Sequence, residues 1–316
     1  MIKVFHDFSP KPSACGEDTT LTLGTFDGVH RGHCRILERV REHAVRTGTA
    51  GAVVTFDRHP MTVVRPGSAP QILTTLEEKV ALFAENGIDT VHVVTFTADV
   101  AEMTAERFVE ERLLGCLSMR HMIVGYDHHF GKGRSGTQTS LEDIARRHGF
   151  TVAVQEPMKY NGRIVKSTAI RESLQNGDVR GAAEMLGRVY TVSGHVAHGT
   201  GTGTRLGFPT ANVTVADATK LIPKDGVYAG WISFGQYRFD AVMNIGGRPT
   251  FNVHGGDVIE VHIPGYTGDM YDADVRVGFS GRIRDISTFQ TEQDLVQRIS
   301  EDVETVKRMQ STSSTY

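Results

Sequence analysis

Cysteines are scarce in this sequence, and the few that occur follow no pattern. Cys15, Cys34 and Cys116 make an odd number without a CxxC spacing, so they indicate neither a disulfide framework nor a thiolate metal site. This usage fits a reducing compartment. We therefore expect a cytoplasmic protein.

Long apolar runs and an excess of positive charge are also missing. No run reaches the ~18 apolar residues that a membrane helix requires, and the first residues lack the apolar core of a signal peptide. Lys and Arg total 34 against 37 Asp and Glu, so no basic field exists to hold a nucleic acid or an anionic membrane by charge alone. The composition favours small-molecule substrates without nucleic-acid or membrane partners, and it leaves the oligomeric state unknown.

The first half of the chain has the pattern of an α/β domain. With 316 residues, of which 39% are hydrophobic, the chain is long enough for two cores. Apolar runs alternate with amphipathic stretches, which predicts a parallel sheet covered on both faces and ligands at the carboxyl ends of its strands. We expect strands at 20–26, 50–56, 91–96, 121–125 and 151–156, and helices at 76–86, 104–114, 140–148 and through Ile36, Leu37 and Val40.

The second half changes to Gly-rich, β-branched segments. After short helices near 168–175 and 178–186, we expect strands at 189–198, 226–234, 237–245, 258–263 and 273–280. Without long helices between them, these strands should pair antiparallel in a small barrel or sandwich. A final helix at 291–308 carries Leu295, Ile299 and Val303 on one stripe. The fold class is therefore α/β plus β, with domains at 1–185 and 186–316.

The segment GTFDGVHRGH at 24–33 lies between a predicted strand and a predicted helix. Its glycines and free backbone amides stand where a helix N-terminus can bind a phosphate. His30 and His33 are three residues apart, so both imidazoles lie on one side of the first turn and can donate toward a phosphoryl oxygen. Taken alone, such a pair could also be a surface zinc site or simply solvated.

This segment resembles the signature of the bacterial riboflavin kinase/FMN adenylyltransferase family, a branch of the HxGH nucleotidyltransferases. Further segments similar to that family follow in the same order: TFDRHP at 55–60, MTAERFV at 103–109, VGYDHHFGKGRSG at 124–136 and VKSTAIRESL at 165–174. The resemblance implies a Rossmann-like N-terminal domain with ATP across the switch point of its sheet. It also implies that the FMN phosphate attacks the α-phosphorus of ATP and that diphosphate leaves.

The resemblance also implies roles for individual residues. His30 and His33 would be catalytic by stabilising the transition-state charge. ATP would be bound by Gly24, Phe26, Asp27, Gly28, Ser167, Thr168 and Arg171, and the flavin side of the site would include His59, Pro60 and Asp127. Asp127 would hold a metal or orient a phosphate, and His59 and Pro60 would line the flavin or the nucleotide pocket. Without the resemblance, Ser167 is an N-cap and Arg171 a solvated charge.

The second half opens with the Gly-rich segment GHVAHGTGTGTRLGFPTANV at 194–213. It lacks the GK[ST] ending and the following helix of a P-loop, so a Walker-type ATPase is not indicated. LGFPTAN closely resembles the riboflavin kinase signature. MNIGGRPTF at 243–251, IEVHI at 259–263 and GDMY at 268–271 are similar to later segments of that family. The resemblance implies a six-stranded Greek-key barrel closed by the C-terminal helix.

For the kinase half, the resemblance implies that Thr210 and Asn212 bind Mg²⁺ and the ATP phosphates, with Gly203 also at the ATP site. Oxygen ligands suit this hard cation. Glu260 would be the base toward the terminal ribityl hydroxyl of riboflavin. In an alternating strand it points away from Ile259 and Val261, although the pattern alone favours an ordinary exposed strand residue.

Several positions depart from the family's pattern. They are Arg58, His128, His129 and Lys166 in the first half and Pro264, Gly265 and Asp272 in the second. The main hypothesis is an enzyme that converts riboflavin to FMN and FMN to FAD with ATP. The alternatives are an enzyme with only one of these activities, a flavin- or nucleotide-sensing protein on the same folds, and an adenylyltransferase for another phosphorylated substrate.

Overall fold

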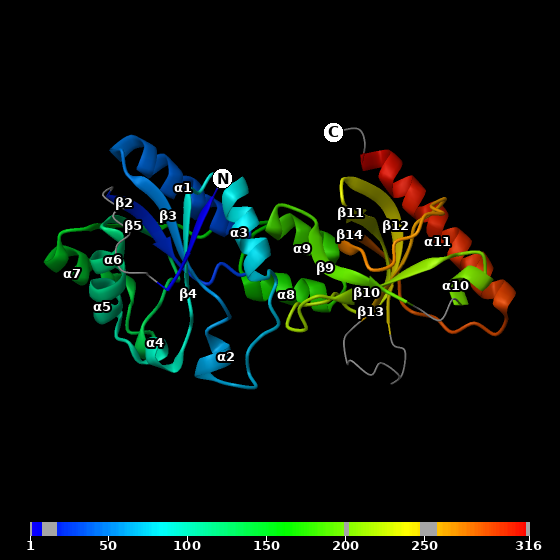
Figure 1. The fold of residues 1–316 in the computed structure, drawn as a ribbon, viewed down its shortest axis with the longest axis horizontal. Coiled ribbons are helices and arrows are strands. Elements are labelled where there is room, and N and C mark those ends of the chain that lie inside the picture. Colours follow the sequence, from blue (N-terminus) through cyan, green and yellow to red (C-terminus); the bar gives the residue numbers. More distant parts are fainter. Residues whose placement is uncertain (1, 8–17, 199–201, 247–257, 314–316) are drawn as a thin grey trace. The chain divides into compact units, whose positions relative to one another are not determined.

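The computed structural model describes residues 2–7, 18–198, 202–246 and 258–313 (Figure 1). The chain divides into two compact units, Met1–Ser167 and Thr168–Tyr316. Most of helix α8 (Ser167–Gln175) and all of α9 (Val179–Leu186) fall in the second unit, where α9 packs against strands β9 (Tyr190–Ala197) and β14 (Asp274–Arg284). The domain boundary at 185/186 remains a prediction.

The first unit is built on a six-stranded parallel sheet with the order β1-β4-β3-β2-β5-β6 (Figure 1). The strands are β1 (Lys3–His6), β2 (Thr19–Leu23), β3 (Ala50–Phe56), β4 (Thr90–Val94), β5 (Met119–Gly125) and β6 (Thr151–Gln155). The helices are α1 (Arg31–Thr47), α2 (Met61–Val64), α3 (Leu76–Glu85), α4 (Ala98–Glu102), α5 (Ala105–Phe108), the π-helix η1 (Val109–Leu114), α6 (Gly115–Leu117), the 3₁₀ helix η2 (Lys132–Arg134) and α7 (Gln138–His148). A short hairpin, β7 (Lys159–Tyr160) and β8 (Arg163–Ile164), leads to α8.

The strand order creates a switch point between β2 and β5. From β2 the chain moves outward through β3 and β4, then returns to place β5 on the other side of β2. In such sheets ligands bind outside the carboxyl ends of the strands at this reversal. The Rossmann-like prediction is confirmed. The additional edge strand β1 was not predicted, because its residues are mostly exposed and have no apolar alternation.

Alternating residues of the strands face two separate apolar layers, as expected for a sheet covered on both sides. On one face, Val53 and Ile123 pack with Leu37, Val40 and Phe83 of α1 and α3. On the other face, Val54 and Met122 pack with Phe108 of α5, Leu113 of η1 and Leu141 of α7. Helices therefore hold the sheet rigid while the loops at its carboxyl edge remain available for a ligand.

The second unit is a closed antiparallel barrel with the order β10-β13-β12-β11-β14-β9 (Figure 1). Besides β9 and β14, it contains β10 (Thr210–Val215), β11 (Gly226–Phe234), β12 (Tyr237–Ile245) and β13 (Val258–His262), with the short helix α10 (Thr202–Arg205). Strands β11, β12 and β13 are consecutive neighbours, and β14 returns beside β11, which is a Greek key. The residue pattern missed strand β10, because only Val213 of its six residues is buried.

Helix α11 (Glu292–Ser313) covers part of the barrel. Ile299, Val303 and Val306 pack against Val227 of β11 and Val242 of β12, so the predicted apolar stripe is confirmed for Ile299 and Val303.

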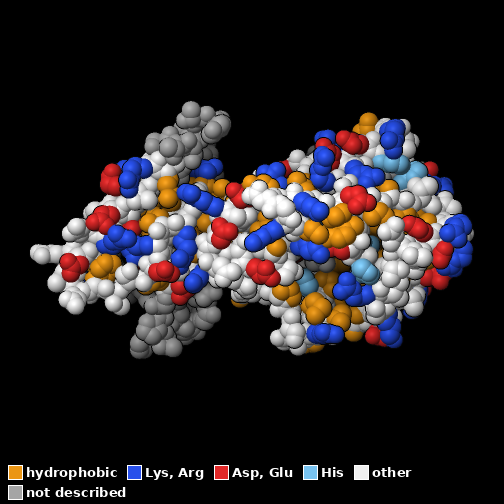
Figure 2. All heavy atoms as spheres, turned by 180° about the vertical axis from the view of Figure 1, so that it is seen from behind, with side chains coloured by type: hydrophobic (Ala, Val, Ile, Leu, Met, Phe, Trp, Pro, Cys, Tyr) orange, Lys and Arg blue, Asp and Glu red, His pale blue; other side chains and the backbone are white. Residues whose placement is uncertain are grey.

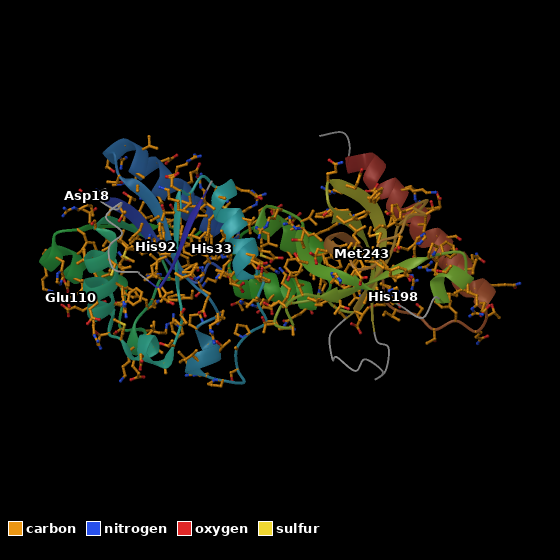
Figure 3. All side chains as sticks on the ribbon, in the orientation of Figure 1. Asp18, His33, His92, Glu110, His198 and Met243 are labelled. Carbon is orange, nitrogen blue, oxygen red and sulfur yellow. The ribbon has the colours of Figure 1, made fainter. Side chains whose placement is uncertain are left out.

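Stability should fall in acid because His92 of β4 is buried in the first unit (Figure 3). Its ring stacks on Phe5 with centroids 5.2 Å apart, and burial lowers its pKa from 6.5 to about 4. The unfolded chain therefore takes up this proton first as the pH falls. Above about pH 6.5 the neutral His92 costs the folded state nothing. Between pH 6.5 and about pH 4 the free energy of unfolding falls, by up to ~1.4 kcal/mol per pH unit.

Urea unfolding of the parent and of His92→Leu between pH 7 and 4.5 checks this expectation. In His92→Leu, the slope of the free energy of unfolding against pH should decrease by about the amount that one proton contributes. The same change at exposed His6 should leave the slope of the parent unchanged. Equal slopes for parent and His92→Leu would contradict the assignment.

Candidate active sites

The loop between β2 and α1 has an unusual backbone. Phe26, Gly28 and Val29 have φ values of 50°, 86° and 35°. Only glycine adopts such angles readily, and a β-branched residue does so at a cost of roughly 1–3 kcal/mol. Contacts with the rest of the unit must therefore hold the loop in this form, and strain of this kind concentrates at functional sites.

His30 and His33, of which His33 is labelled in Figure 3, form a stacked pair at the beginning of α1. Their ring centroids are 3.6 Å apart, and Phe26 contacts His33 edge-on at 5.1 Å. The Nδ1 of His30 accepts a hydrogen bond from the backbone N–H of His33 at 3.3 Å. His30 Nε2 is then the nitrogen that carries hydrogen, so it can donate to a ligand. The pair lies on one side of the first turn, as its spacing predicted.

Asp27 ties the loop to the segment before α3. Its Oδ1 accepts from the backbone N–H groups of Leu73 at 2.8 Å and Thr74 at 3.1 Å. The N–H of Gly28 donates to Thr74 Oγ1 at 2.9 Å. This carboxylate is buried, and its Oδ1 fixes the loop, a role that the sequence did not reveal.

Asp127 and Lys166 lie close together beyond the carboxyl end of β5. Lys166 Nζ is 3.8 Å from Asp127 Oδ2 and 5.5 Å from the centre of the Tyr126 ring. Tyr126, and then Asp127, raise the pKa of Lys166, so it is positively charged at neutral pH.

Ser167, the first residue of α8, contacts the loop from the other side of the switch point. Its Oγ donates to the carbonyl oxygen of Asp27 at 2.8 Å. The structure thus gathers the histidine loop and Ser167, with Asp127 and Lys166 at the end of the neighbouring strand. Thr168 and Arg171 follow in the second unit, and their place at the ATP site remains a prediction.

His59 and Pro60 follow β3, at the same edge of the sheet but one strand away. Pro60 is the N-cap residue of α2, and His59 Nδ1 accepts from the N–H of Met61 at 3.2 Å. The neighbouring Arg58 donates to Asp57 at 2.9 Å and is largely exposed. Two of the three predicted flavin residues, His59 and Pro60, are therefore in a loop at the ligand edge.

The two histidines that follow Asp127 differ in their surroundings. Burial lowers the pKa of His128 from 6.5 to about 4, so it is neutral at physiological pH. His129 is exposed, and its Nδ1 contacts the carbonyl oxygen of Asp127 at 2.8 Å. His128 therefore supplies no positive charge to a phosphate in this loop.

Three polar residues form a row across neighbouring barrel strands. Glu260 of β13 is paired in register with Asn212 of β10 on one side and Asn244 of β12 on the other. Asn244 Nδ2 donates to Glu260 Oε2 at 3.2 Å. Ile259 and Val261 are buried while Glu260 is half-buried, which confirms the predicted alternation. Asn244 was not singled out from the sequence, although its segment was.

Gly203 and Thr210 are brought together at the entrance to β10. The N–H of Phe208 donates to the carbonyl oxygen of Gly203 at 2.8 Å. A Cβ at Gly203 would meet Phe208 O at 2.4 Å and Thr210 Oγ1 at 3.1 Å, so this turn requires glycine. Thr210 and Asn212 lie on the same side of β10, since they are two residues apart. The remaining Gly-rich residues 199–201 and positions 247–257 lie outside the described residues.

Comparison with known proteins shows which family the chain belongs to. A family model described as FAD synthetase matches residues 13–169, and one described as riboflavin kinase matches residues 186–310. The bifunctional riboflavin kinase/FMN adenylyltransferase of Pseudomonas fluorescens is 33% identical over 314 residues, which is 99% of each chain. This chain belongs to the bifunctional riboflavin kinase/FMN adenylyltransferase family. The family member from Bacillus subtilis strain 168 is 32% identical and covers 90% of both chains.

A solved structure confirms the fold of this family member. It is described as a macrolide-efflux protein from Streptococcus pneumoniae and matches with a TM-score of 0.86 at 25% identity, over 97% of this chain and 99% of that one. Among the helices of the described residues, none combines the length and apolarity that crossing a bilayer requires.

The departures from the family's pattern in the barrel lie in two turns. Pro264 and Gly265 follow β13, where the N–H of Tyr266 donates to Ile263 O at 3.2 Å. Asp272 has a φ of 59°, the left-handed conformation that glycine adopts freely and that aspartate tolerates better than most residues. These substitutions are thus compatible with the local backbone.

Proposed function

We propose that this family member makes flavin cofactors in two ATP-dependent steps. The barrel converts riboflavin and ATP to FMN and ADP, and the parallel-sheet unit converts FMN and ATP to FAD and diphosphate. The observation that carries the proposal is the pairing of two separate sites in one chain, the stacked histidines at a helix N-terminus and the Asn212–Glu260–Asn244 row. We assign the adenylylation of FMN to residues 1–185 and the phosphorylation of riboflavin to residues 186–316.

In the adenylyl transfer, a phosphate oxygen of FMN attacks the α-phosphorus of ATP, and diphosphate leaves. No bond to the protein forms, so catalysis consists of positioning and charge stabilisation. His30 and His33 donate toward the α-phosphoryl oxygens. Gly24, Phe26, Asp27 and Gly28 of the loop bind the nucleotide, although the N–H groups of Gly24 and Gly28 are already paired with Val54 O and Thr74 Oγ1. Ser167, Thr168 and Arg171 at the start of α8 bind its phosphates.

In the kinase step, the terminal ribityl hydroxyl of riboflavin attacks the γ-phosphorus of ATP. Glu260 accepts the hydroxyl proton while the oxygen–phosphorus bond forms and ADP leaves. The hydrogen bond from Asn244 holds one oxygen of the Glu260 carboxylate in place. Gly203 allows the Gly-rich turn to approach the ATP phosphates closely.

The cation of the kinase site is Mg²⁺ in this proposal. Thr210 and Asn212 offer oxygen donors on one side of β10, and Glu260 adds negative charge next to Asn212, a donor set that suits a hard cation. When bound, the ion neutralises the triphosphate charge. Thr210 and Asn212 would hold it.

The remaining assignments concern the residues on the flavin side of the site, the cellular compartment and the class of substrate. His59 and Pro60 line the flavin side of the adenylylation site, and Asp127 orients a phosphate there. The free cysteines Cys34 and Cys116 fit work in the cytoplasm. Positive and negative side chains are interspersed over the face drawn in Figure 2, which favours small-molecule substrates over a nucleic acid.

A time course with purified protein, riboflavin and MgATP tests the function. FMN should appear first and FAD later, and both should require the divalent cation. FMN as the final product would indicate that only the kinase activity is retained. Tight flavin binding without any product would favour the sensing alternative.

Lys166 is expected to strengthen ATP binding for adenylylation, because a cation near phosphates forms charge-assisted contacts. Since this side chain is about half exposed, solvent screening keeps the effect modest. Lys166→Ser should raise the ATP KM of FAD formation about threefold, while Lys159→Ser, also exposed, should not. An unchanged KM in Lys166→Ser would refute the role.

A further inference from the structure

One buried lysine in the first unit takes no part in the chemistry described above. Lys79 of α3 is only 6% exposed. Its amino group donates to the carbonyl oxygen of Thr25 at 3.3 Å, to Thr55 Oγ1 at 3.4 Å and to the carbonyl oxygen of Phe56 at 3.0 Å. A buried ammonium group is tolerated only when all of its donors are paired, as they are here.

The acceptors of Lys79 lie at the carboxyl ends of two neighbouring strands. Thr25 belongs to the strained loop that follows β2, between Gly24 and Phe26, whereas Thr55 and Phe56 end β3. The lysine therefore joins the nucleotide loop to the strand from which the His59 loop departs. It does so at the edge of the sheet where the ligand binds.

The helix that carries Lys79 is itself firmly anchored. Thr75 and Glu78 form a capping box at the start of α3, and Asp27 and Gly28 of the nucleotide loop bind Leu73 and Thr74 immediately before it. The loop is thus held at two places, by Lys79 of α3 through Thr25 and by the segment before α3 through Asp27. Such a double anchor can maintain the positive φ angles of Phe26 and Val29.

We infer that Lys79 is a positioning residue for FMN adenylylation: its three hydrogen bonds keep the nucleotide loop, and with it the histidine pair, in the geometry that the transfer requires. This inference rests on the proposed assignment of that loop to the adenylylation site. Lys79 acts through the backbone of Thr25 and touches neither substrate.

The charge of Lys79 makes this role dependent on pH. Burial lowers its pKa from 10.5 to about 8, and the neighbouring Asp27 and Asp57 offset this only in part. At pH 7 the ammonium form has three N–H donors for its three acceptors. Above pH 8 the neutral amine keeps two donors, so one acceptor loses its partner and the loop is held less firmly.

The pH profile of the unaltered protein tests the inference first. The kcat of FAD formation from FMN should fall between pH 7 and 9.5 with an apparent pKa near 8, while FMN formation from riboflavin serves as the internal control. A constant ratio of the two rates over this range would overturn the proposal.

The variant Lys79→Met keeps the length of the side chain but has no donor. It should lower the kcat of FAD formation about 10²-fold, the loss that a misplacement of about 1 Å can produce, and the alkaline fall should disappear. FMN formation should change less than twofold, and Lys3→Met, at an exposed lysine of the same unit, should change neither rate. Full FAD formation in Lys79→Met would refute the inference.

His33→Ala separates this inference from the assignment of the site. If His33→Ala retains FAD formation, the loop is not the adenylylation site and the proposed function of this unit fails. If His33→Ala loses FAD formation while Lys79→Met keeps it, only the role of Lys79 is wrong. Should Lys79→Met fail to fold, the pH profile of the unaltered protein still decides.

Discussion

His33→Ala is expected to reduce FAD formation from FMN by ~10²–10³, because loss of one preorganised donor to the transition-state oxygens has this size. His33 stacks on His30 with ring centroids 3.6 Å apart at the N-terminus of α1, and it belongs to a different unit from Glu260. FMN formation from riboflavin should therefore continue at its normal rate.

Glu260→Gln should give the opposite pattern. The amide keeps the size of the side chain but cannot accept the proton, and loss of a general base lowers a rate by ~10²–10⁴. Riboflavin phosphorylation should nearly vanish, whereas supplied FMN should still become FAD.

Measuring both half-reactions on both variants gives each protein an internal control. Circular dichroism of each variant checks that the fold is intact. If either folded variant lost both activities equally, the assignment of two independent sites would be wrong. If neither rate changed, His33 would be a packed histidine and Glu260 an ordinary strand residue.

Asp302→Ala should lower the free energy of unfolding of the barrel by ~3–5 kcal/mol, the usual result of removing one partner of a buried ion pair. Asp302 of α11 is 3% exposed and accepts from Arg284 of β14 through Nε and Nη2, at distances of 3.1 and 2.8 Å. Without the carboxylate, the largely buried guanidinium group of Arg284 loses its only ion-pair partner among the described residues.

The neighbouring pair on the same helix provides the matched control. Arg298 and Glu301 are 2.7 Å apart, but their side chains are 43% and 49% exposed, so Glu301→Ala should leave the free energy of unfolding nearly unchanged. Urea unfolding of both variants makes the comparison. Equal losses in the two variants would contradict the argument, and so would a stable Asp302→Ala.

Much of the fold could be predicted because its elements have apolar patterns of their own. The strands expected at 50–56, 226–234 and 237–245 have the bounds seen for β3, β11 and β12. Strand β10 lacked such a pattern, since only Val213 of its six residues is buried. Edge strand β1 lacked it as well, because its side chains are mostly exposed.

The candidate site residues could be found only where they belong to a contiguous motif. His30, His33, Thr210 and Asn212 stand in such segments, and so does Glu260. Lys79 does not stand in such a segment. One signal was nevertheless present, because Lys79 occupies the apolar stripe of α3 together with Leu76, Val80 and Phe83, and a lysine in such a stripe is expected to be buried. Asn244 became visible only through its hydrogen bond to Glu260.

By itself, the sequence determined most of the strands and helices, the family and the two chemical motifs, because apolar periodicity and short motifs are local properties. Tertiary structure alone decided which distant residues meet. Strand pairing aligned Asn212, Glu260 and Asn244, and the packing of α3 brought Lys79 to Thr25. These contacts depend on register and on the reversal of strand order, which no short segment encodes.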